Sequence, residues 1–237
     1  MTRRHILQGL TSAGAAMIIS GCSDQYNQTW NQKLTITVRT PAGDKTGSAV
    51  LQATSEHGYG LGAGEYKKVN ITGEAAVVDL GGGKYLFALL SNSNLPNPAI
   101  MTYIADETFL AAGLIKDRKT INYELAHSVG AKAVVPPKFY PMLVTFTNIN
   151  DPKSVKEVKP DDLTAAIGSG TSIKSITLEI TDEKVTEGTV EKVLGWLIGH
   201  KFRILSPDIR LGSGLHNASD VLPIEKLTRI DFVENSR

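Results

Sequence analysis

The chain of 237 residues predicts an α+β fold that is strand-dominated, with largely antiparallel sheets, one well-defined amphipathic helix and a few short helices. Two observations predict it. Apolar and polar residues alternate along several short segments that end in Gly, Pro or Asn, and only residues 186–199 show a clear helical spacing of apolar residues. The sequence has no tandem repeat at the periods of solenoids or propellers.

The first half of the chain predicts a series of strands. Leu34, Ile36 and Val38 alternate with polar residues, and the turn at residues 41–44 leads into a hairpin partner at 48–53. Further strands are expected at 69–71, 75–80 and 85–90, with the glycines at 81–83 turning the last two.

The second half mixes short helices with strands. The pattern predicts short helices at 106–114 and 122–129, an extended or edge segment at 134–141 and a buried strand at 142–147. A short helix at 163–167 and a strand at 173–180 follow. The principal helix is expected at 186–199, packed on a sheet face, and a last strand at 227–233.

The N-terminal residues have the pattern of an export signal. Arg3 and Arg4 provide a positive start, and a mildly apolar run follows from Gly9 to Gly21. A run of about 13 residues is too short to cross a bilayer core, which takes about 20 residues in a helix. We therefore expect a cleaved signal rather than a permanent transmembrane helix.

Both ends of this signal resemble known export motifs. Ile19, Ser20, Gly21 and Cys22 resemble the lipobox of bacterial lipoproteins, in which the cysteine is acylated and becomes the first mature residue. Residues 2–8, with Arg3 and Arg4, resemble the twin-arginine export consensus, although Gln8 stands where lysine is usual. The resemblance implies a lipid anchor at Cys22, the only cysteine in the chain.

The resemblance also implies a location in the bacterial cell envelope, anchored by lipid and facing the periplasm. Ser23, directly after the anchor, favours the outer membrane. The expected organisation is a signal peptide at 1–21, the acylated cysteine with a polar tether at 22–32, and a single strand-rich domain at 33–237, which the sequence also allows to be two lobes, 33–93 and 131–237. Parts of residues 141–183 resemble uncharacterised proteobacterial lipoproteins, a resemblance that implies no activity.

Composition limits the partners. Without the signal, the chain has 23 basic and 24 acidic residues, so nothing suggests nucleic-acid binding, which needs a clear basic surplus. With Cys22 acylated, no thiol remains for a disulfide or a thiolate metal site. The expected partners are membrane lipid, through Cys22, and an unidentified envelope protein, and we expect no cofactor.

Two glycine-rich runs resemble phosphate-binding loops only superficially. The alternating glycines at 58–64 lead into a predicted strand rather than a helix, so a hairpin loop is the better interpretation. Gly81 to Lys84 is interpreted as a turn, because Tyr85 stands where a phosphate loop needs Ser or Thr.

No catalytic or metal-ligating residue can be assigned. The mature histidines are His57, His127, His200 and His216, and their spacing matches no metal motif. The acidic residues Asp151, Glu157, Asp161 and Asp162 are close in sequence, but turn and helix-cap chemistry accounts for the aspartates as well as Ca²⁺ binding would. Trp196 is interpreted as partly buried packing.

These observations favour a lipid-anchored, non-catalytic binding or assembly module. The alternative is an envelope hydrolase with a His/Asp/Glu site assembled in space. A weaker third option is carriage of an apolar ligand, which requires a large apolar cavity between sheet and helix.

Overall fold

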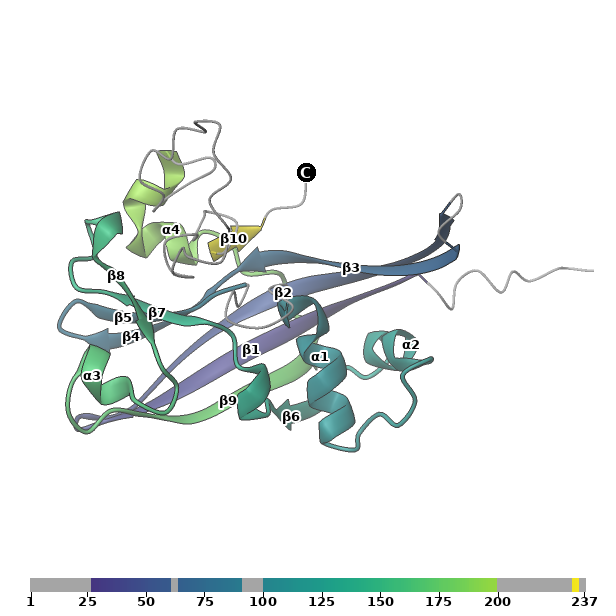
Figure 1. The fold of residues 1–237 in the computed structure, drawn as a ribbon, viewed down its shortest axis with the longest axis horizontal. Coiled ribbons are helices and arrows are strands. Elements are labelled where there is room, and N and C mark those ends of the chain that lie inside the picture. Colours follow the sequence, from purple (N-terminus) through teal and green to yellow (C-terminus); the bar gives the residue numbers. More distant parts are fainter. Residues whose placement is uncertain (1–26, 61–63, 91–99, 200–231, 235–237) are drawn as a thin grey trace, which may run out of the picture.

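The fold is α+β and strand-dominated, with two antiparallel sheets and few helices, as the sequence predicts. The computed structural model describes residues 27–60, 64–90, 100–199 and 232–234. Six strands form the larger sheet in the order β10-β3-β2-β1-β9-β6, and four form the smaller sheet in the order β4-β5-β7-β8 (Figure 1).

The larger sheet is built from long strands that alternate between a buried and a half-exposed face. Its members are β1 (Gln28–Thr40), β2 (Gly43–Gly60), β3 (Gly64–Glu74), β6 (Lys132–Val134), β9 (Ser172–Thr181) and β10 (Val233–Glu234). Along β1, Leu34, Ile36 and Val38 are buried, whereas Thr35 and Thr37 are half-exposed on the opposite face. This period-two burial confirms the strands that alternation predicts at 34–38, 48–53 and 173–180.

β1 begins earlier than the alternation indicates. Its first residue, Gln28, pairs with Ser55, so the last residues of the segment expected as a polar tether are in the sheet. The amide-rich stretch folds as a strand because its inward positions have packing of their own. Trp30 is buried, and its indole N–H donates to the Oε1 of buried Gln32 at 3.0 Å.

The smaller sheet crosses the buried face of the larger one. It consists of β4 (Ala76–Gly81), β5 (Lys84–Ala88), β7 (Leu143–Phe146) and β8 (Val155–Val158). Gly47 on β2 permits the close approach, because a Cβ built there would lie 1.9 Å from the carbonyl oxygen of Val77 on β4. The predicted strands at 75–80, 85–90 and 142–147 and the glycine turn at 81–83 are confirmed.

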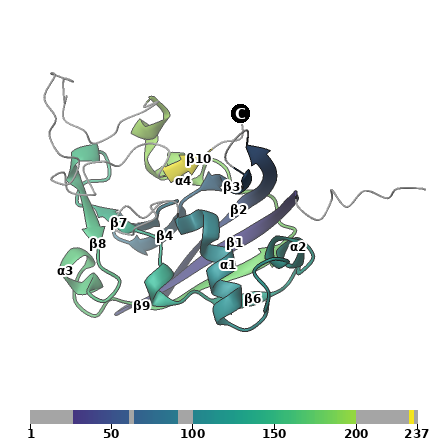
Figure 2. The same cartoon turned by 45° about the vertical axis from the view of Figure 1, so that its right-hand side comes forward.

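Helices α1 (Ile100–Ala111) and α2 (Ile121–Ala126) share the buried face of the larger sheet with the smaller sheet (Figure 2). Met101, Ile104 and Phe109 from α1 and Leu125 from α2 join one buried cluster with β1, β2 and β9. Packed side chains therefore fill the space between this sheet and these helices. The predicted helices at 106–114 and 122–129 are present, but both start earlier and end earlier.

A second buried cluster covers the other face of the smaller sheet. Phe87, Val144 and Phe146 pack there against Val190 of α4 (Thr189–Val193), against Leu194, which follows it, and against Leu197 of the 3-10 helix η3 (Gly195–Gly199). The smaller sheet is thus the middle of three layers, between the larger sheet and the α4–η3 segment (Figure 1).

The prediction of one helix from Thr186 to Gly199 is wrong in its length. The α-helical part is five residues, Thr189–Val193, and η3 follows after Leu194. The start is delayed because Thr186 is bonded to β2 and because Gly188, with φ 74°, is the left-handed residue that precedes the helix. The longest helix is instead α1, with 12 residues.

The remaining elements are short. They are 3-10 helices η1 (Pro137–Phe139) and η2 (Pro152–Ser154) and helix α3 (Leu163–Ile167). Within the described ranges, no helix is both long enough and apolar enough to span a bilayer. Each sheet joins strands from residues 28–88 to strands from residues 132–181. β1 pairs with β9 in the larger sheet, and β5 pairs with β7 in the smaller one. Of the strand predicted at 227–233, residues 227–231 lie outside the described residues, and Val233 begins β10.

Candidate functional site

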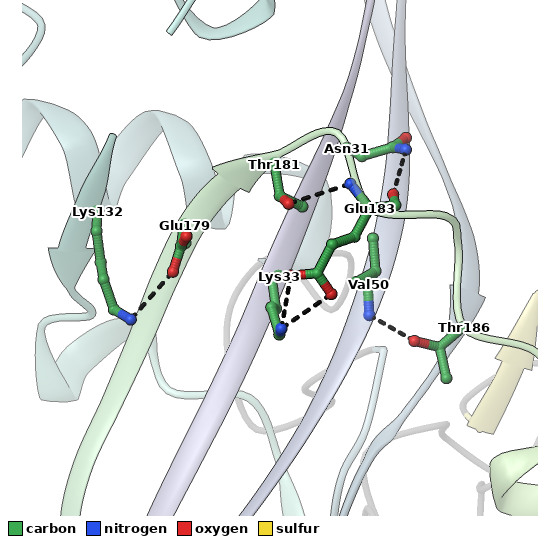
Figure 3. A network of polar contacts seen from close by, with 8 residues as sticks. All are labelled: Asn31, Lys33, Val50, Lys132, Glu179, Thr181, Glu183 and Thr186. Atoms are coloured by element: carbon green, nitrogen blue, oxygen red, sulfur yellow. Dashed lines mark hydrogen bonds and ion pairs between the residues drawn. The ribbon is translucent and has the colours of Figure 1, made fainter. Parts of the chain in front are cut away.

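The chain after β9 turns back across the half-exposed face of the larger sheet. We call residues 182–188 the crossing segment. Asn31 on β1 donates from Nδ2 to the carbonyl oxygen of Glu183 at 2.9 Å, and Lys33 contacts both carboxylate oxygens of Glu183 at 2.7 and 2.9 Å (Figure 3). These contacts hold the start of the crossing segment over β1.

Thr186 holds the middle of the crossing segment against β2. The Val50 N–H donates to Thr186 Oγ1 at 2.8 Å, and the Thr186 N–H donates to the Val50 carbonyl at 3.0 Å (Figure 3). Pairing of β2 with β3 ends at Gln52↔Thr72, so no residue of β3 pairs with Val50. Thr186 takes this place and satisfies the N–H and carbonyl groups of Val50.

Glu74 fixes the end of the crossing segment. This last residue of β3 is 1% exposed, and its carboxylate accepts the N–H groups of Thr189 and Val190 at 2.9 and 2.7 Å. A carboxylate at this position satisfies two free donors of the first turn of α4 and complements the partial positive charge there. The crossing segment is therefore bonded to β1 and β2, and the first turn of α4, directly after it, is bonded to β3.

A cavity of about 510 Å³ lies between the crossing segment and strands β2 and β3. The strands contribute Gln52, Thr72 and Glu74, and the other side contributes Thr186, Glu187 and Glu191 among others. Among the described residues of the lining there are three carboxylates and no Lys, Arg or His. It therefore offers mostly hydrogen-bond acceptors and negative charge, which suits a ligand with N–H donors or positive charge.

The lining offers little for catalysis. Both oxygens of Glu74 already accept backbone N–H groups, and the described part of the lining places no histidine or lysine beside the hydroxyls of Thr72 and Thr186 to act as a base. Among the described residues, no group of three or more His, Cys, Asp or Glu could hold a metal ion.

Two groups with shifted pKa values lie outside this cavity lining. The hydrogen bond and the negative charge of Glu107 raise the pKa of Arg118, whose Nη1 lies 2.8 Å from Glu107 Oε1. Burial raises the pKa of the Tyr140 phenol. Neither group belongs to the cavity.

The residues of the predicted export signal lie outside the described residues. They are Arg3, Arg4, Ile19, Ser20, Gly21 and the predicted lipid-attachment site Cys22. Of the histidines, His200 and His216 also lie outside, and His57 is placed only by its backbone pairing with Lys67.

His127 is engaged locally. It follows α2, where its Nδ1 lies 2.8 Å from the carbonyl oxygen of Tyr123, and its ring stacks on that tyrosine at 4.2 Å between centroids. These contacts explain its position without a catalytic role.

Two of the four acidic residues at 151–162, Asp151 and Asp162, have the turn and cap roles that the sequence allows. Asp151 accepts the N–H of Lys153 at 2.9 Å, and Asp162 accepts that of Ala165 at 3.2 Å. The cap of α3 is Asp162, not Asp161 as the position after proline indicates. Trp196 packs edge-on against Phe146 and donates to the Ile149 carbonyl at 2.9 Å, which confirms its packing role.

The comparisons with known proteins are negative. This chain matches no protein-family model, no curated protein and no solved structure. Its function has to be argued from its own residues.

Proposed function

We propose that this protein is a lipid-anchored component of the bacterial cell envelope, held by acylated Cys22, whose body is a non-catalytic binding or assembly module facing the periplasm. The observation that carries the proposal is the order of residues in the first 22 positions. A lipoprotein signal has a positive start, a short apolar run and a lipobox, in that order and at this spacing. Here these parts are Arg3 and Arg4, the run from Gly9 to Gly21, and Ile19-Ser20-Gly21-Cys22.

The start of the described body supports this arrangement. β1 begins at Gln28, six residues after Cys22, so a short stretch of chain connects the proposed anchor to the sheet. One acyl chain gives only marginal membrane binding, whereas two or three chains on Cys22 hold a domain stably.

The cavity beside the crossing segment supports the binding role. Bonds from three strands hold its acceptor-rich lining, and the lining residues that the structure describes include no histidine or lysine beside the hydroxyl groups. An exposed peptide or protein segment with N–H donors or basic side chains fits this chemistry better than an apolar ligand does.

The anchor is tested in cells with Cys22→Ser, against Ser12→Ala as a matched control that removes a hydroxyl from the apolar run. We expect a labelled fatty acid to be incorporated by the parent and the control and not by Cys22→Ser, which should leave the membrane fraction. Identical fractionation and no label in any of the three proteins would contradict the proposal.

The binding role is tested by crosslinking in cells and purification from detergent extract. We expect one envelope protein to be recovered repeatedly with the parent and less of it with Glu187→Gln/Glu191→Gln. Glu157→Gln/Asp161→Asn makes the same change of charge on exposed residues near β8 and should leave recovery unchanged. Recovery of the lipoprotein alone would count against a binding module.

A further inference from the structure

The first strand and the hairpin beside it identify the end of the body from which the tether leaves. Gln28, the first residue of β1, pairs with Ser55, but β2 continues to Gly60 and pairs with β3 up to Gly60↔Gly64. Figure 1 shows β2 and β3 continuing past the start of β1. The hairpin arms, residues 56–60 and 64–68, therefore project beyond the sheet on the side where the chain enters it.

The length of the projection matches the length of the tether. Ser55 to Gly60 is five residues, which span about 17 Å in a strand. Cys22 to Gln28 is six residues, which reach at most about 20 Å when fully extended. An anchor at Cys22 therefore cannot hold the start of β1 much further from a bilayer than the hairpin arms already extend.

Helix α2 lies at the same end. Asn122 donates to the hydroxyl of Ser55, the residue that pairs with Gln28, and Val129 lines a small cavity together with Thr29 and Trp30. Two large hydrophobic residues are exposed here, Tyr123 at 42% and Val129 at 61%. Exposed tyrosine beside an aliphatic residue suits the membrane–water interface, where one end of the ring is apolar and the other wet.

Exposed basic residues accompany these apolar ones. Lys68 on β3 and Lys119, just before α2, are both exposed, and Lys67 precedes Lys68. Acidic residues lie here as well: Glu56 is opposite Lys68, Glu65 is in the second arm, and exposed Asp182 lines the same small cavity as Val129, so the charge of this end is mixed. Lysines near a bilayer gain from the negative charge of anionic headgroups.

We propose that this tether end, comprising the hairpin arms and the exposed residues of and around α2, rests on the surface of the bilayer in which Cys22 is anchored. The proposal rests on the lipid anchor proposed above and adds an orientation to it. The β1–β2 turn at the opposite end of the same strands then points away from the membrane.

The orientation is tested with the full-length lipoprotein, purified and reconstituted into vesicles of phosphatidylethanolamine and phosphatidylglycerol. An acylated Cys22 does not react with thiol labels, so one introduced cysteine can carry a fluorophore. We compare Lys68→Cys and Val129→Cys with Ala42→Cys, an exposed position in the β1–β2 turn at the far end. Lipids with a nitroxide on the headgroup should quench the first two several-fold more than the third.

A second set of variants tests the contacts themselves. With the label at Lys68→Cys, we expect Tyr123→Ser/Val129→Ser to reduce quenching. Val134→Ser/Ile198→Ser removes two hydrophobic residues that are more exposed, at 62% and 68%, but lie elsewhere, on β6 and η3, and should leave quenching unchanged. An equal loss in both pairs would overturn the assignment of the contact to α2 and its flank.

Mass spectrometry of the same samples separates the two proposals. An acylated protein with equal quenching at all three labels overturns the orientation and leaves the anchor intact. A protein without an acyl group overturns both.

Discussion

The two sheets differ in how many of their faces are buried. The six-stranded sheet buries one face, where Leu34 and Ile36 are at most 1% exposed, and leaves the other half-exposed with threonines and charged residues. The four-stranded sheet is covered on both faces, so Leu86 joins one cluster and its neighbour Phe87 the other. The smaller sheet should therefore carry more of the stability per residue, and the half-exposed face of the larger sheet is the one left available for binding.

The largest expected effect is that of Phe87→Ala. Phe87 is fully buried and packs edge-on against Phe146 and Phe232, with centroids 5.6 and 6.0 Å away. Loss of the ring leaves a cavity between the smaller sheet and α4, which should lower the free energy of unfolding by about 3–5 kcal/mol. Thr35→Ala, on the half-exposed face of β1, should change it by less than about 0.5 kcal/mol.

Urea denaturation followed by tryptophan fluorescence measures this difference. Trp30 belongs to the cluster between the sheets, and Trp196 packs against the other cluster. Trp196→Phe therefore leaves a single reporter in the first cluster, and Trp30→Phe leaves a single reporter beside the second. Coincident transitions would show that the middle sheet couples the layers into one cooperative unit. Separate transitions would contradict this coupling, because the two clusters would then unfold independently.

The next effect is expected where the two sheets touch. In Gly47→Ala, the added methyl group would meet the Val77 carbonyl, a backbone group that cannot turn aside. The change should cost about 3 kcal/mol, at the upper end of what overpacking usually costs. Gly195→Ala is the control, because a Cβ there has no atom within 4 Å. Similar urea midpoints for the two variants would show that the sheets can separate at this corner without cost.

A smaller effect is expected at the junction between the sheets and the crossing segment. Glu74→Ala removes the acceptor of two N–H groups, one of them buried, and should cost about 2 kcal/mol. Glu74→Gln keeps one acceptor oxygen and should recover part of the loss. Circular dichroism during denaturation measures both, and equal stability of Glu74→Ala and the parent would mean that α4 is held by its apolar contacts alone.

The number of buried faces also explains which strands can be predicted from the sequence. Strands with one buried face alternate visibly, as at 34–38 and 173–180, and strands buried on both faces appear as short apolar runs, as at 142–147. The beginning of β1 is hidden because Asn31 and Gln32 have no strand-like pattern. Their place depends on pairing with residues about 20 positions further along the chain.

The cavity could not be predicted because its parts are distant in sequence. Gln52, Glu74 and Glu187 meet only after the chain crosses back over two strands, and none belongs to a motif. One local signal is available in retrospect. Gly188 before Thr189 marks the true start of α4, and it leaves Thr186 and Glu187 free to form the crossing segment rather than a helical turn.

The smallest effect is expected on the half-exposed face itself. Lys33 and Glu183 form an ion pair at 2.7 Å, with side chains 28% and 51% exposed. Lys33→Met should cost only about 0.2–1 kcal/mol, because exposed ion pairs are screened and lose side-chain entropy. The pair nevertheless holds the start of the crossing segment, so hydrogen exchange at the Thr186 amide should quicken more than global stability falls. Lys132→Met breaks the comparable pair with Glu179 on the same face and should leave that amide unchanged. Equal acceleration of exchange at this amide in both variants would mean that the crossing segment opens only with the whole sheet. The bonds of Thr186 to Val50, and of Glu74 to the start of α4, would then suffice to hold it.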